Sequence, residues 1–111
     1  MQKMLVKVNK EKMKELGISE YYIDLTLHDA FDEGHFFVEE LEDGSILYTG
    51  NPEYPNYFGL FGAAASVLVD DEDFMKVCEK WIWYDNAQTK DGSFDEEDIL
   101  EQIKSGEGFD D

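Results

Sequence analysis

The spacing of apolar residues predicts a strand and then a short helix at the start of the chain. Apolar side chains recur at every second position from Met4 to Val8, which is the period of a strand with one face turned inward. A helix over residues 10–16 is expected next, because Asn9 is a good N-terminal cap and Gly17 a good C-terminal stop.

The segment from Ser19 to Gly34 carries two patterns at once. Apolar residues at positions 23, 27, 30 and 31 share one face of a helical wheel, whereas apolar and polar residues also alternate over 21–28, as in a strand. The helical pattern extends past the point where the alternation stops, and Ser19 can cap its start. We therefore favour a helix over residues 19–33, with a strand as the alternative.

The middle of the chain predicts a hairpin followed by a buried helix. In residues 35–50, aromatic and β-branched positions flank the pair Asp43-Gly44, which suits a type I′ turn. A proline-containing loop follows over residues 51–57. Small residues are then frequent over 58–69, and because small side chains let backbones approach closely, we expect a fully buried helix there.

Two tryptophans flank Ile82 in the sequence DFMKVCEKWIWYDN, residues 73–86. We expect a helix here, because the acidic run 70–73 suits a helix N-terminus. On a helical wheel Trp81 lies in the apolar arc and Trp83 on the opposite face. Trp83 is then either covered by a second layer of the protein or exposed as an anchor for a partner.

A last helix is predicted from Ser93, which has capping-box spacing to Glu96, to a stop at Gly106. Together the segments predict an α+β fold, in which a small sheet of about three strands (the N-terminal strand and the hairpin) packs with four or five helices. A chain of 111 residues suits one domain. We expect a single globular domain over residues 1–106 and a mobile acidic tail over residues 107–111.

Composition favours a folded cytoplasmic protein. Hydrophobic residues make up 42% of the chain, far more than in disordered chains of high charge. Cys78 is the single cysteine, so no internal disulfide is possible, and we expect a buried, inert thiol in a reducing compartment. The start of the chain does not resemble a signal peptide. The longest uncharged stretch, residues 54–69, is too short and too interrupted to span a membrane.

Charge is the strongest functional signal in the sequence. The chain has 27 acidic residues and nine lysines, with no arginine, for a net charge of −18. Residues 1–15 carry +3, residues 16–75 carry −14 without one cation, and residues 76–111 carry −7. Such a field repels nucleic acid and anionic membranes, and the lack of arginine argues against phosphate recognition. No nucleotide-binding or hydrolase motif occurs, and no cofactor is expected.

The leading expectation is a non-enzymatic binding protein that engages a basic surface of another protein, as an inhibitor or a nucleic-acid mimic. Its candidate contact residues are the acids of the hairpin, the acidic run before the tryptophan segment, and one tryptophan: Glu39, Glu40, Glu42, Asp43, Asp70, Asp71, Glu72, Asp73 and Trp83.

Two alternatives from other classes stay open. Asp24, His28 and Asp32 follow Glu20 at i, i+4 spacing, so one helix face would hold oxygen ligands and an imidazole suited to a divalent metal ion, in a metal-binding module or a metal-dependent enzyme. A solvated polar stripe is the stronger interpretation of that face. Alternatively, the acidity serves only solubility, and the protein forms a homodimer through Trp83.

Overall fold

The computed structural model describes residues 2–32, 35–54, 57–85, 91 and 93–105. Within these residues the chain forms five strands and five helices. In order along the chain they are β1 (Gln2–Val8), α1 (Lys10–Leu16), α2 (Glu20–Ala30), β2 (Phe36–Glu40), β3 (Ile46–Gly50), α3 (Tyr57–Val69), α4 (Glu72–Val77), β4 (Cys78–Asp85), β5 (Asp95–Asp98) and α5 (Ile99–Lys104).

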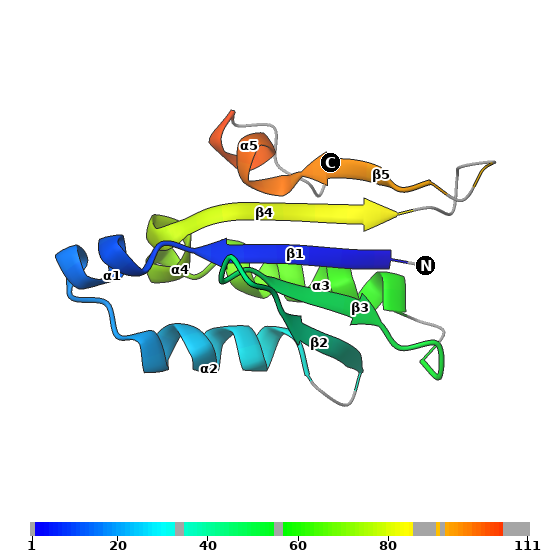
Figure 1. Cartoon of the computed structure of the whole chain (residues 1–111), viewed down its shortest axis with the longest axis horizontal. Helices are drawn as coiled ribbons and strands as arrows, with labels where there is room; N and C mark the ends of the chain where they lie inside the picture. Colours follow the sequence, from blue (N-terminus) through cyan, green and yellow to red (C-terminus); the bar gives the residue numbers. More distant parts are fainter. Residues whose placement is uncertain (1, 33–34, 55–56, 86–90, 92, 106–111) are drawn as a thin grey trace.

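The strands form one antiparallel sheet in the order β2-β3-β1-β4-β5, with β1 in the centre (Figure 1). The α+β class is therefore confirmed. The expected number of about three strands is too low, because β4 and β5 arise from segments that the sequence pattern assigned to helices. Figure 1 also shows α3 running along the sheet, behind β1 and β3.

One face of the sheet carries the hydrophobic core. Met4 and Val6 of β1 are buried on this face together with their cross-strand neighbours Tyr48 and Trp81. Apolar residues from α2, α3, α4 and α5 belong to the same core cluster. The opposite face bears the intervening residues of the strands, among them three lysines: Lys3, Lys7 and Lys80. No helix in the described parts of the chain has the length and apolar character needed to cross a membrane.

The helix predictions near the N-terminus are confirmed, because they rest on local capping. The side chain of Asn9 accepts a hydrogen bond from the Lys12 N–H at 3.0 Å, and Gly17 closes α1 in the left-handed conformation, with φ of 69°. Ser19 accepts a hydrogen bond from the Tyr22 N–H at 3.3 Å and starts α2. The segment that was ambiguous between helix and strand is thus helical from Glu20 to Ala30, and the predicted helix end at residue 33 lies outside the described residues.

The hairpin is confirmed, but its turn is not of type I′. That turn requires positive φ at both central residues, and in the described chain only glycines have positive φ: Gly44 has φ of 87°, whereas Asp43 does not. The Gly44 N–H donates to the Leu41 carbonyl at 3.1 Å, and the Leu41 N–H donates to the Ser45 carbonyl at 2.8 Å. This is a three-residue loop that ends in a left-handed glycine.

The helix expected over 58–69 is present as α3, but it is not fully buried. Phe61, Ala65 and Leu68 are buried in the core, whereas Val67 is 48% exposed. A Cβ atom placed on Gly62 would contact nothing within 4 Å, so no closely packed neighbour requires a glycine at this position. The helix packs one face on the sheet and turns the other to solvent.

The helix predicted over residues 73–86 is wrong beyond its first turns. It ends at Val77, and Cys78 adopts extended angles (φ −68°, ψ 120°) that lead into β4. The aromatic and branched residues from Trp81 to Tyr84 favour a strand, and β1 supplies a partner along its whole length. Pairing with β1 outweighs the helical periodicity. A local sequence pattern cannot detect this pairing, because β1 is distant in the sequence.

The last helix also starts later than predicted. Asp95–Asp98 pair with β4 as a strand, and α5 begins at Ile99 with Asp98 as its cap, whose side chain accepts from the Glu101 N–H at 3.0 Å. The capping box from Ser93 to Glu96 is therefore wrong. The stop at Gly106, residues 86–90 and 92 before β5, and the tail 107–111 lie outside the described residues.

Candidate functional site

The four acids of the hairpin lie on its exposed end. Glu39, Glu40, Glu42 and Asp43 are all solvent-exposed. The Asp43 carboxylate accepts hydrogen bonds from the hydroxyl and the backbone N–H of Ser45, at 2.6 and 2.9 Å. These bonds lower the pKa of Asp43 below its usual value, and the positive charges of Lys7 and Lys80 add to the effect. Asp43 therefore shapes the turn, while the three glutamates project from it.

The acidic run 70–73 has a mixed role. Asp70 and Glu72 are exposed, whereas Asp71 and Asp73 are half-buried. The Asp71 carboxylate caps α4 by accepting from the Phe74 N–H at 2.9 Å, and it also accepts the Tyr22 hydroxyl at 2.7 Å. The bond to Asp71 raises the pKa of Tyr22, and desolvation adds to it. Asp71 thus ties α2 to α4, which leaves Asp70 and Glu72 as the more available acids.

Both acidic groups lie toward the end of the sheet at which β1 finishes (Figure 1). Val6 pairs with Ile46 next to the hairpin loop, and the Asn9 N–H donates to the carbonyl of Val77, at the end of α4, at 2.8 Å. The fold therefore places at the same end of the sheet two clusters that are about thirty positions apart in the sequence.

Trp83 lies on the core side of β4 and not on an exposed helix face. It pairs with Met4, is partly buried, packs against the core cluster, and has its ring centroid 6.1 Å from that of Phe61. The helix face from which it was expected to contact a partner or a second copy does not exist. The main role of Trp83 is therefore to pack against the hydrophobic core.

A third acidic group, which the sequence analysis assigned to a helix start, lies on the edge strand β5. Asp95, Glu96, Glu97 and Asp98 are all exposed. Four consecutive carboxylates in a strand are the signal that was available in the sequence. It was missed as a surface because such residues also suit a helix N-terminus.

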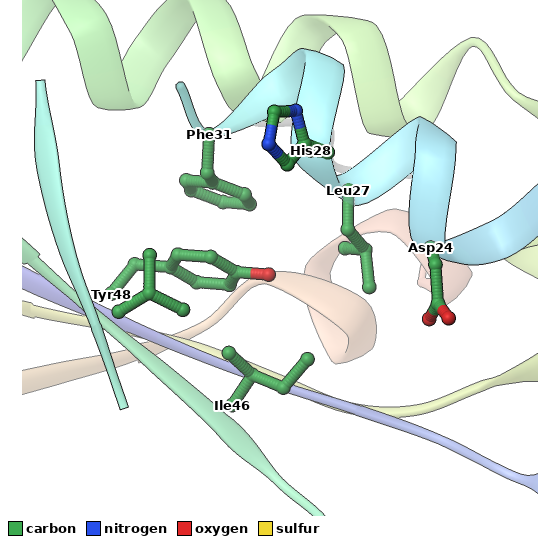
Figure 2. Close-up of a pocket in the computed structure, with 7 residues that line it drawn as sticks. Asp24, Leu27, His28, Phe31, Ile46 and Tyr48 are labelled. Carbon is green, nitrogen blue, oxygen red and sulfur yellow. The ribbon is translucent and has the colours of Figure 1, made fainter. Parts of the chain in front are cut away.

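A small pocket lies between α2 and the β2–β3 hairpin (Figure 2). Its volume is about 100 Å³. Leu27 and Phe31 of α2 form one side, and Ile46 and Tyr48 of β3 the other. The Phe31 and Tyr48 rings stack with centroids 3.8 Å apart, which fixes the pocket floor. The remaining lining residues are exposed and mark the opening: Asp24, His28 and Val38.

The polar groups of this pocket are few. Tyr48 is buried, and burial raises the pKa of its hydroxyl far above the usual value, with the charge of Asp24 as a smaller cause. Figure 2 shows that hydroxyl pointing along the pocket toward the end where Asp24 lies. The pocket thus combines an apolar body with a neutral phenol and a carboxylate at its mouth.

The metal alternative gains no support from this geometry. Among the described residues, no group of three or more histidine, cysteine, aspartate or glutamate side chains could hold a metal ion. Asp24 and His28 line the pocket, while Asp32 lies 3.3 Å from the Nδ1 atom of His35. Asp32 lies beyond the end of α2 at Ala30, so the i, i+4 spacing does not bring the three side chains to one site.

Cys78 is buried, as predicted. Burial raises the pKa of its thiol to about 12, so the thiolate is scarce at neutral pH.

No protein-family model matches the sequence, no curated protein matches it, and no solved structure matches it.

Proposed function

We propose that this protein binds a basic surface of another protein and acts as an inhibitor or a nucleic-acid mimic. The observation that carries the proposal is the edge strand β5, where every residue from Asp95 to Asp98 presents an exposed carboxylate. The acids of the hairpin loop and of the α3–α4 corner form separate negative groups, because β2 and β5 are opposite edges of the sheet.

Most of the carboxylates have no cation to pair with. The chain has 27 acidic residues and nine lysines, so even if every lysine paired with a different carboxylate, 18 carboxylates would have no lysine partner. Three of the lysines project from the face of the sheet opposite the core, where Lys7 lies 3.6 Å from Glu79. Three lysines are too few to neutralise the exposed carboxylates of the β5 edge and the hairpin loop, which keep an excess of negative charge.

The spacing of the β5 carboxylates supports mimicry of a nucleic acid. A strand advances about 3.4 Å per residue and its side chains alternate between two faces, so β5 carries one negative charge per ~3.4 Å in total and one per ~7 Å on each face. Each strand of duplex DNA also carries one charge per about 3.4 Å of helix axis. A cleft lined by lysine and arginine that closes around this outer strand and contacts both of its faces would meet a similar charge density along β5.

The test is a salt titration of binding to a cationic DNA-binding domain, with duplex DNA as competitor. We expect the affinity to fall about tenfold or more between 50 and 300 mM salt, because screening weakens exposed charge pairs. Duplex DNA should displace the protein. Affinity that does not change with salt contradicts the proposal.

Charge-neutral variants locate the surface. The triple variant Asp95→Asn, Glu96→Gln, Glu97→Gln keeps Asp98 as the cap of α5 and should weaken binding and flatten the salt dependence. The matched control Glu11→Gln, Glu15→Gln, Glu53→Gln removes the same charge from exposed positions elsewhere. If the two triple variants lose affinity equally, binding follows net charge and not the β5 edge.

A further inference from the structure

The outer edge of β2 presents unused backbone hydrogen-bonding groups. The Leu41 N–H donates to Ser45 and the Asn51 N–H donates to His35, so the odd-numbered residues of β2 form the hydrogen-bonded pairs with β3. The even-numbered residues Phe36, Val38 and Glu40 therefore direct their N–H and C=O groups to the outside. The Phe36 N–H donates to the Asp32 carbonyl, while in the described chain no backbone group pairs with Val38 or Glu40 on that edge.

The same residue, Val38, also lines the pocket beneath α2. A strand added antiparallel to β2 would place the side chain opposite Val38 on the face of Val38, because cross-strand neighbours share a face. That face leads to the pocket formed by Leu27, Phe31, Ile46 and Tyr48. An unpaired edge and a pocket for an alternate side chain are the two parts of a strand-addition site.

We infer that β2 and α2 form a docking groove for an extended basic segment of the partner, which adds as a sixth strand along Val38 and Glu40. This inference rests on the proposed function and names the form in which a part of the basic partner binds. Charge complementarity selects this occupant over a second copy, because Asp24 lies at the mouth of the pocket and the exposed Glu40 shares the face of Val38, and a second copy would bring a further −18.

A lysine or arginine side chain fits the chemistry of the pocket. Its methylene stem would pack on Leu27, Phe31 and Ile46, and its charged head would reach Asp24 at the mouth, as long basic side chains do at the edges of apolar surfaces. The buried Tyr48 hydroxyl, which is neutral at neutral pH, would accept a hydrogen bond from the charged head. A purely apolar side chain would leave both polar groups unused.

The probe is an eight-residue peptide of alternating lysine and threonine. It is compared with the same peptide methylated on the backbone nitrogen of each lysine. N-methylation keeps the charge but removes the donor that would pair with the outward carbonyl of Val38. We expect the unmodified peptide to bind at least ten times more tightly, and the amide protons of Val38 and Glu40 to become protected from exchange on binding.

Three protein variants locate the groove. Val38→Pro replaces an outward N–H with a ring without breaking the bonds to β3. Because the ring blocks the approach of an added strand at this position, the unmodified peptide should bind this variant no more tightly than the N-methylated peptide does. Asp24→Asn should weaken binding several-fold. Asp29→Asn is the matched control: it removes the same charge from an exposed position of the same helix that is not among the residues lining the pocket, and it should have little effect.

The outcomes separate this inference from the proposed function. Equal affinity for both peptides, or equal losses in Asp24→Asn and Asp29→Asn, overturns the groove and leaves binding by diffuse charge. Failure of both peptides and of the cationic DNA-binding domain overturns the inference and the proposed function together. Sedimentation of the wild type as a dimer that Val38→Pro dissociates also overturns the inference, because the edge would then be filled by a second copy.

Discussion

Trp81 and Trp83 lie on the same face of β4, opposite Val6 and Met4 of the central strand. In a strand, residues two positions apart share a face, whereas in a helix they lie about 200° apart. The presence of two tryptophans around one isoleucine is therefore explained by a strand that buries both rings. Trp81 is fully buried against Phe74, and Trp83 packs on Phe61.

Truncation of these rings should destabilise the fold in proportion to burial. Trp81→Ala should lower the free energy of unfolding by about 3–5 kcal/mol, because it removes a fully buried aromatic side chain and leaves a cavity. Trp83→Ala should cost less, since Trp83 is only partly buried. Urea denaturation followed by circular dichroism measures both.

Lys80→Ala is the control for these truncations, because Lys80 lies on the opposite face of the same strand and is exposed. It should change stability little. A Trp83→Ala protein as stable as the wild type would show that the ring does not belong to the core.

Ser45 should control the titration of Asp43. The Ser45 hydroxyl and N–H both donate to the Asp43 carboxylate and lower its pKa below 3.8. Removing the hydroxyl in Ser45→Ala should raise the pKa of Asp43 toward that value, which a carboxyl-detected NMR titration measures.

The dependence of stability on pH follows from that shift. A depressed folded-state pKa stabilises the protein above the unfolded pKa, and the stabilisation is lost as pH falls through the folded pKa. The stability difference between wild type and Ser45→Ala should therefore shrink below pH ~3.8. A difference that stays constant down to the acid limit would mean that the carboxylate does not depend on Ser45.

The sequence was sufficient where structure is decided locally. The caps Asn9 and Ser19 and the left-handed Gly17 fixed α1 and α2, because capping depends on residues three positions apart. It failed for β4, because the helical wheel of residues 73–86 is a valid pattern and only pairing with β1 replaces it. It failed for β5 for a related reason, since consecutive acids suit both a helix start and a solvated edge strand.

The candidate site was predicted in part. Clusters of acidic residues can be found in the sequence, and most acids of the hairpin and of the α3–α4 corner are exposed in the structure. The groove was not predictable, because Val38 and Tyr48 meet Asp24 only after α2 packs beside the hairpin. The sequence pattern suggested Asp24 and His28 as metal ligands. In the structure they instead lie at the mouth of a pocket that Ile46 and Tyr48 of β3 also line.

Cys78 should resist thiol reagents in the native protein. Burial raises the pKa of its thiol to about 12, so at pH 8 the reactive thiolate is a very small fraction and is also inaccessible. Labelling with a chromogenic disulfide should be slow in buffer and should accelerate to the rate of a free thiol in denaturing urea. Rapid labelling without denaturant would contradict the burial of this residue.

The bond between Tyr22 and Asp71 joins positions 49 residues apart and can be separated from the cap that Asp71 provides to α4. Asp71→Ala removes both, and loss of the cap alone should cost about 1 kcal/mol. Asp71→Asn keeps a side chain that caps helices well and removes the charge, so the pKa of Tyr22 should fall toward 10.0.

A raised folded-state pKa stabilises the protein below the unfolded pKa, and this stabilisation is lost as pH rises through the folded pKa. The stability advantage of the wild type over Asp71→Asn should therefore diminish above pH ~10. Tyr22→Phe is the control, since it removes the hydroxyl and should make stability above pH ~10 insensitive to the change at position 71. Ultraviolet titration of tyrosinate, with chemical denaturation at each pH, measures both quantities, and an unchanged Tyr22 pKa in Asp71→Asn would show that the two side chains are not in contact in solution.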